Sequence, residues 1–130
     1  MTLFVDSSGI LALVDRDDPA HGEVVDAFSL GRSESLSPHA YVIVETLAVA
    51  RRRYGPAITA DLIDRVIPAL DVAPVDADLH AAAVAAFRDT VESSVSLVDR
   101  TSFAFMRRVG IERAIALDAD FRTAGFETLP

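Results

Sequence analysis

The chain has 130 residues, the length of one ordinary domain, and 51% of them are hydrophobic, which is ample for a buried core. Cysteine is absent, so the sequence excludes disulfides, cysteine nucleophiles and cysteine-based zinc sites, and it suits a reducing compartment. The N-terminal residues lack the basic start of a signal peptide, and no uncharged apolar run approaches the roughly 18 residues of a membrane-spanning helix. We therefore predict one domain over residues 1–130, located in the cytoplasm and without membrane contact.

The formal net charge is -8, from 20 acidic and 12 basic residues. Taken alone, this charge argues against a nucleic-acid partner, because phosphate binding is driven mainly by cationic side chains. The basic residues are all arginines, however, and arginine is the side chain that forks onto phosphate. Arg51, Arg52 and Arg53 are adjacent and form a candidate contact to nucleic acid. A coding bias toward arginine, or a solvated helix end favoured by the helix dipole, explains the same cluster.

In the first part of the chain, short apolar runs alternate with helical stretches. Residues 3–6 form an apolar run that ends in a carboxylate and predicts a buried strand. A helix is predicted over residues 7–14, and a second one over 19–30 with proline at its first position. Residues 36–37 are a candidate strand. The clearest helix covers residues 39–54 and is ended by a glycine.

The second part of the chain continues this alternation. A helix is predicted over residues 56–69, and residues 71–75 predict a strand whose proline suggests an edge position. An alanine-rich helix over 76–91 and a loop over 93–96 precede a helix over 97–109, which a glycine ends.

The last predicted elements are two short strands, at 114–117 and 126–129, separated by a loop or short helix at 118–123. Short apolar strands that alternate with helices of ten or more residues indicate a parallel sheet. The predicted fold class is α/β, in the form of a three-layer α/β/α sandwich with a short central parallel sheet.

Four carboxylates occupy positions where the neighbouring residues are apolar. Asp6 and Asp118 each come at the end of a predicted strand, Glu45 lies inside an otherwise apolar helix, and Asp99 lies at a helix start. A carboxylate removed from water must be paired, hydrogen-bonded, protonated or bound to a metal. Because the ligand crevice of an open α/β sheet lies beyond the carboxyl ends of its strands, we expect these side chains to meet there.

Oxygen ligands without histidine or cysteine point to Mg²⁺ or Mn²⁺. Each residue also has a plainer explanation. Asp6 or Asp99 taken singly fits a helix N-cap, and Glu45 can pair with an arginine. Asp118 can be a turn residue, with Asp120 in the functional position. The three histidines share no metal-ligand spacing, and we assign them structural or surface roles.

Four short motifs contain these acids: Val5-Asp6-Ser7-Ser8, Val44-Glu45, Ser96-Leu97-Val98-Asp99 and Leu117-Asp118-Ala119-Asp120-Phe121. Each is weakly specific, but the ordered set with this spacing closely resembles the PIN domain, and specifically the VapC toxins of toxin–antitoxin pairs. The resemblance runs over positions 3–129, which is nearly the whole chain.

The resemblance implies a Mg²⁺-dependent endoribonuclease, with Mn²⁺ as the other candidate ion, acting as the toxin of a VapBC-type pair. It also implies a cognate antitoxin, an RNA substrate and a homodimer. Carried over to this sequence, the catalytic positions fall on Asp6, Glu45, Asp99 and Asp118. We expect Asp6, Asp99 and Asp118 to be metal ligands and Glu45 to be a general base or a group outside the metal shell.

One position departs from the family pattern. Ala116 stands where the family often has a hydroxyl residue, two positions before the last acid. Ser7 and Thr101 are candidates to replace that hydroxyl, and Asp120 is a further accessory candidate.

Two other functions fit less well. A Mg²⁺-dependent phosphatase-type hydrolase usually has a second aspartate two residues after the first, where this chain has Ser8, and it usually employs a lysine, which this chain lacks. A catalytically silent PIN-like module that only binds RNA or protein would be favoured if one acid were missing, and all four are present.

Overall fold

The computed structural model describes residues 1–91 and 94–130, and within them it contains one parallel sheet with strands in the order β2-β1-β3-β4. The strands are β1 Thr2–Val5, β2 Ser35–Ser37, β3 Arg113–Ile115 and β4 Glu127–Leu129. The α-helices are α1 Ser7–Val14, α2 His21–Phe28, α3 Ala40–Tyr54, α4 Pro56–Asp61, α5 Ala77–Asp89, α6 Leu97–Val109 and α7 Asp120–Thr123. A 3-10 turn at Ser29–Arg32 follows α2.

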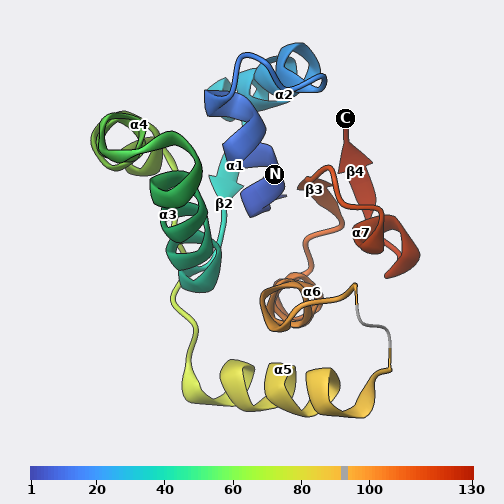
Figure 1. Cartoon of the computed structure of the whole chain (residues 1–130). Helices are drawn as coiled ribbons and strands as arrows, with labels where there is room; N and C mark the ends of the chain where they lie inside the picture. Colours follow the sequence, from blue (N-terminus) through green and yellow to red (C-terminus); the bar gives the residue numbers. More distant parts are fainter. Residues whose placement is uncertain (92–93) are drawn as a thin grey trace.

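Helices cover both sides of the sheet. Figure 1 shows α1 and α2 on one side, and α6 with α5 outside it on the other. The predicted three-layer α/β/α arrangement is therefore confirmed. No helix in the described part of the chain is long and apolar enough to cross a membrane.

The central strand β1 explains the apolar run at the start of the sequence. Leu3, Phe4 and Val5 are fully buried, because a parallel strand inside such a sheet is covered on both faces. The Phe4 ring lies 5.9 Å from that of Phe105 in α6 and 6.0 Å from that of Phe121 in α7, measured between centroids. These contacts anchor the helices of one layer on the sheet.

The strand order creates a switch point between β1 and β3. From β1 the chain proceeds to β2 on one side, and it then crosses over to β3 on the other. Open α/β sheets bind ligands beyond the carboxyl ends of the strands at such a point. Asp6 directly follows β1 and Asp118 comes three residues after β3, so both acids lie where the topology favours a site.

The prediction of a strand at residues 71–75 is wrong. The segment starts beside β2, where the Asp71 amide donates to the Leu36 carbonyl, and it forms one isolated bridge, between His39 and Ala73. The Ala73 amide donates to the Pro38 carbonyl, and the Ala40 amide donates to the Ala73 carbonyl, both at 2.9 Å. The partner segment enters helix α3 at Ala40, so no extended backbone remains with which the pairing could continue.

Two predicted helices also differ in detail from the structure, and one predicted loop is described only in part. The second helix begins at His21 rather than Pro19, because the Asp18 side chain accepts the Ala20 amide at 2.8 Å and shapes a turn there. The predicted helix over 56–69 is helical throughout but changes type, to a π-helical turn at Leu62–Val66 and a 3-10 turn at Ile67–Ala69. Residue 93 of the predicted loop 93–96 lies outside the described residues.

Candidate active site

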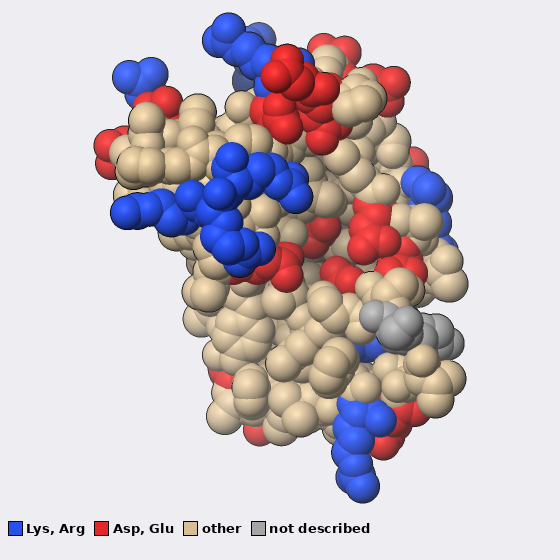
Figure 2. Space-filling view, viewed as in Figure 1, with Lys and Arg blue, Asp and Glu red and all other residues tan. Residues whose placement is uncertain are grey.

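A cleft of about 410 Å³ lies beyond the carboxyl ends of β1 and β3. All four predicted carboxylates line it, and each comes from a different segment of the chain. Figure 2 shows acidic side chains gathered in the hollow of this face, with arginine side chains on its rim. The residues that line the cleft are Asp6, Ser7, Ser8, Leu11, Asp18, Glu45, Val49, Arg53, Ser96, Asp99, Leu117 and Asp118.

Asp6 is the most buried acid of the cleft, with 3% of its surface exposed. It is the N-cap of α1, and its Oδ2 accepts hydrogen bonds from the Ser8 amide at 3.3 Å and the Ser8 hydroxyl at 2.6 Å. Its Oδ1 is buried and accepts none from the residues that the structure describes. Burial raises the pKa of Asp6, and the nearby charge of Glu45 raises it further.

Asp99 occupies the first turn of α6 and belongs to a capping box. The Ser96 hydroxyl accepts the Asp99 amide at 3.0 Å, and the Ser96 amide donates to Asp99 Oδ2 at 3.2 Å. Burial is the main cause that raises the pKa of Asp99 to about 6, and the charges of Asp6 and Asp118 add to it. Asp6 is thus a helix N-cap, as the plainer explanation held, whereas the N-cap of α6 is Ser96 and Asp99 is the third helical residue. Both acids line the cleft as well.

Glu45 reaches the cleft from the middle of α3, where it is half-buried. Its Oε1 accepts a hydrogen bond from the Ser7 hydroxyl, which ties α1 to α3 at the cleft. Ser7, an accessory candidate from the sequence, therefore contacts an acid of the site.

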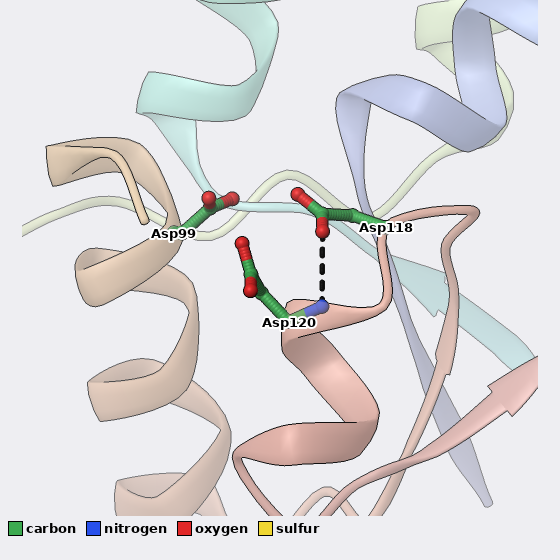
Figure 3. A group of neighbouring side chains, drawn as sticks. All are labelled: Asp99, Asp118 and Asp120. Carbon is green, nitrogen blue, oxygen red and sulfur yellow. Dashed lines mark hydrogen bonds between the residues drawn. The ribbon is translucent and has the colours of Figure 1, made fainter. Parts of the chain in front are cut away.

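Asp118 and Asp120 both belong to the acidic cluster. One carboxylate oxygen from each of Asp99, Asp118 and Asp120 lies within 4.8 Å of the other two, and Figure 3 shows the three side chains turned toward one another. Asp118 Oδ1 also accepts the Asp120 amide at 2.9 Å. The sequence left open which of the two is the fourth acid. Asp118 lines the cleft, and Asp120 adjoins two of its acids, Asp99 and Asp118.

Thr101 and two of the three candidate arginines do not line the cleft. The Thr101 hydroxyl donates to the Leu97 carbonyl inside α6 at 2.8 Å, and Thr101 does not line the cleft. Of the three adjacent arginines proposed to contact nucleic acid, Arg53 lines the cleft. The guanidinium carbon of Arg53 lies 5.8 Å from the centre of the Tyr54 ring.

His39 joins the helices that carry Glu45 and Asp99. Its Nδ1 accepts the amides of Tyr41 and Val42 at the start of α3, so its Nε2 carries the hydrogen and donates to the Ser102 hydroxyl at 2.9 Å. That hydroxyl donates to the Val98 carbonyl in α6. Burial lowers the pKa of His39 to about 4, so the ring is neutral and its role is structural.

Sequence reasoning missed Ser8 and Ser96, which hold Asp6 and Asp99. Ser96 could have been found from the Ser-x-x-Asp spacing of a capping box. The contact of Ser8 with Leu117 had no comparable signal, because it joins segments more than 100 residues apart.

Comparisons with known proteins identify the family of this chain. A family model described as PIN domain matches residues 3–127. The 23S rRNA-specific endonuclease VapC20 of Mycobacterium tuberculosis is 36% identical over 126 residues, which is 95% of either chain. The crystal structure of VapC20, described as a Sarcin-Ricin loop cleaving toxin, has a TM-score of 0.85 at 34% identity and covers 98% of this chain and 99% of that one. FitAcB from Neisseria gonorrhoeae shares the fold, with a TM-score of 0.71 at 15% identity and coverage of 100% and 97%.

The chain therefore belongs to the PIN-domain family and, within it, to the VapC endoribonuclease toxins. The family predicted from the four motifs is confirmed. PIN nucleases are generally metal-dependent, and the acidic cluster beside the switch point agrees with that requirement.

Proposed function

We propose that this chain, as a single nuclease domain over residues 1–130, is a Mg²⁺-dependent endoribonuclease toxin that cleaves the sarcin–ricin loop of 23S rRNA. The observation that carries the chemistry is the buried Oδ1 of Asp6, which accepts no hydrogen bond from the described residues and lies in a cleft with three more acids. A carboxylate in that state needs a cation nearby to remain ionised at neutral pH. A divalent ion with a preference for oxygen ligands fits this set of donors.

Asp6, Asp99 and Asp118 are the residues that would hold the ion, with Asp120 behind Asp118 as a further oxygen donor. When bound, the ion lowers the pKa of a water molecule and stabilises negative charge on the phosphate. Glu45 is the proposed general base, because it is half-buried and the Ser7 hydroxyl fixes its Oε1. Its second oxygen would accept the proton of the attacking water. Mn²⁺ would occupy the same ligands.

The rim of the cleft would bind the RNA backbone through arginine. Arg53 lines the cleft, and Arg51 and Arg52 are exposed beside it at the end of α3. Guanidinium groups pair with phosphate in a forked geometry and would offset the repulsion from a chain with a net charge of -8. The partners would thus be RNA at the cleft, a cognate antitoxin that keeps the toxin inactive, and a second copy in a homodimer.

The proposed substrate rests on the similarity to VapC20, which is named for its specificity for 23S rRNA and spans nearly all of this chain at 36% identity. Such a substrate is part of the ribosome, so the protein would act in the cytoplasm.

The test uses antitoxin-free protein and two labelled RNA hairpins with one stem, one carrying the sarcin–ricin sequence and the other a permuted loop. We expect wild type with Mg²⁺ to cut only the first hairpin, and EDTA or Asp6→Asn to abolish cleavage. Asp26→Asn is the matched control, because Asp26 is exposed on α2 away from the cleft and the charge change is the same.

Equal cleavage of both hairpins would overturn the substrate and leave the ribonuclease in place. Cleavage that persists in EDTA would overturn the metal. If wild type cleaved no RNA at all, a catalytically silent binding module would become the better explanation.

A further inference from the structure

The ladder of hydrogen bonds between β1 and β3 ends at the cleft. Its last backbone rung is the Asp6 amide, which donates to the Ile115 carbonyl at 3.0 Å. Beyond that point the Ala116 amide turns to Leu129 in the neighbouring strand. The next amide, that of Leu117, donates to the hydroxyl of Ser8 at 3.0 Å. A side-chain hydroxyl thus replaces the backbone carbonyl as the next rung.

The same hydroxyl fixes the Asp6 carboxylate. Ser8 Oγ donates its hydrogen to Asp6 Oδ2 at 2.6 Å while it accepts from Leu117, so both of its bonds are defined. The Ser8 amide donates to the same oxygen. Oδ2 is therefore satisfied by the protein, whereas Oδ1 accepts no hydrogen bond from residues 1–91 and 94–130.

Gly9 holds this turn against β3. A Cβ atom built on Gly9 would lie 2.9 Å from the Ile115 carbonyl oxygen and 3.0 Å from the Ile115 Cγ2 atom. Any larger residue would push the start of α1 away from the strand. The close approach that glycine permits is what brings Ser8 within reach of Leu117.

We propose that Ser8 is a positioning residue of the nuclease site. Its hydroxyl determines which oxygen of Asp6 is offered to the metal, and it joins the turn that carries Asp6 to the segment that carries Asp118. This inference rests on the metal-dependent function proposed above. It concerns the orientation of the ligand and assigns Ser8 no contact with the substrate.

The neighbouring serine provides a matched control. Ser7 is adjacent in sequence and equally a hydroxyl of the cleft, but it donates to Glu45. Removing the Ser7 hydroxyl should therefore impair turnover through Glu45 and leave the orientation of Asp6 intact. Removing the Ser8 hydroxyl should loosen Asp6 and weaken the binding of the metal itself.

The experiment measures Mn²⁺ binding in the absence of RNA, from the electron paramagnetic resonance signal of the free ion. We expect Ser8→Ala to weaken Mn²⁺ binding by about 10- to 100-fold, the usual effect of removing a group that orients a metal ligand. Ser8→Thr, which keeps a hydroxyl, should bind more tightly than Ser8→Ala, and Ser7→Ala should bind as wild type does. Thermal unfolding in EDTA checks that each variant is folded.

If Ser8→Ala fails to fold, Ser8→Cys and Gly9→Ala replace it, because the first supplies a weaker donor and the second displaces the turn. Both should then bind Mn²⁺ more weakly than Ser7→Ala. The inference is overturned if wild type binds Mn²⁺ and a folded Ser8→Ala binds it equally well, an outcome that leaves the proposed function standing. Failure of wild type itself to bind Mn²⁺ overturns both proposals.

Discussion

Each end of the parallel sheet has a hollow lined by acidic side chains. At one end these side chains are exposed to water or paired with arginine, and at the other end two of them are buried. Near the amino ends of β1, β3 and β4 lies a hollow of about 680 Å³, larger than the 410 Å³ cleft at the carboxyl ends. Glu112 and Glu127 line it and are exposed to water. Arg113, also on its wall, forms an ion pair with Glu34 at 3.0 Å.

At the carboxyl ends, Asp6 and Asp99 are buried and burial raises the pKa of each. The difference teaches that cavity size does not identify this active site. What distinguishes the smaller cleft is that the protein holds several carboxylates out of water at a free-energy penalty, and such a penalty is a usual sign of function. The larger hollow contains acids that are hydrated or paired, and it needs no ligand to be stable.

The largest expected effect is on cleavage. Asp99→Asn should lower the rate of RNA cleavage by at least about a hundredfold, because a lost metal ligand removes several kcal/mol of transition-state stabilisation. Glu112→Gln, the corresponding change at the other end of the sheet, should leave the rate unchanged. Single-turnover cleavage of the hairpin measures both. A large loss of cleavage rate in Glu112→Gln would show that the hollow at the amino ends of the strands also takes part in cleavage.

The next effect is on stability and depends on pH. Since the pKa of Asp99 is raised to about 6, the folded protein is most stable when this group is protonated, and that stability is lost as pH rises from about 4 through 6. In EDTA at pH 7.5, Asp99→Asn should therefore increase the free energy of unfolding by up to about 3 kcal/mol. Near pH 4 the variant and wild type should be equal.

Urea unfolding at the two pH values tests this prediction. Adding Mg²⁺ at pH 7.5 should stabilise wild type and not the variant, because binding to the folded state alone raises its stability. A difference between the proteins that is the same at both pH values would show that burial of the Asp99 charge is not its cause.

The smallest effects separate two arginines. Arg53→Gln, at the cleft, should raise the KM for RNA several-fold. It should also make the plot of log affinity against log salt concentration less steep by about one unit, the contribution of one phosphate contact. Arg113→Gln, at the other end, should lower the free energy of unfolding by about 1 kcal/mol through loss of the ion pair with Glu34 and leave the KM unchanged. Equal KM values for the two variants would remove Arg53 from the RNA-binding surface.

Much of the cleft could be predicted because its acidic residues occur next to apolar segments of the sequence. Asp6 after an apolar strand and Glu45 inside an apolar helix are placed by burial patterns, and parallel topology brings strand ends to one edge. Asp118 followed from the same rule. The oxygen-only ligand set predicted the metal, and the family resemblance, carried by four ordered motifs, added the RNA substrate.

The features that sequence reasoning missed depend on geometry between distant segments. The strand predicted at 71–75 has a suitable composition, but its partner segment turns into helix α3 at Ala40, which limits the pairing to one bridge. The contact of Ser8 with Leu117 depends on how closely α1 approaches β3, which periodicity does not encode. Arg53 lines the cleft in place of Arg52, although helical spacing alone puts Arg52 on the face of Glu45.

The place of β1 between β2 and β3 also has a consequence for synthesis of the protein. Asp6 directly follows β1, whereas β3 and Asp118 are synthesised long after it. Because a domain folds as a unit once its pairing segments are available, a nascent chain carries half of its acidic cleft with no partner for it. The cleft is complete only once β3 and the segment with Asp118 have been synthesised, so a nascent chain that ends before them has no assembled acidic site.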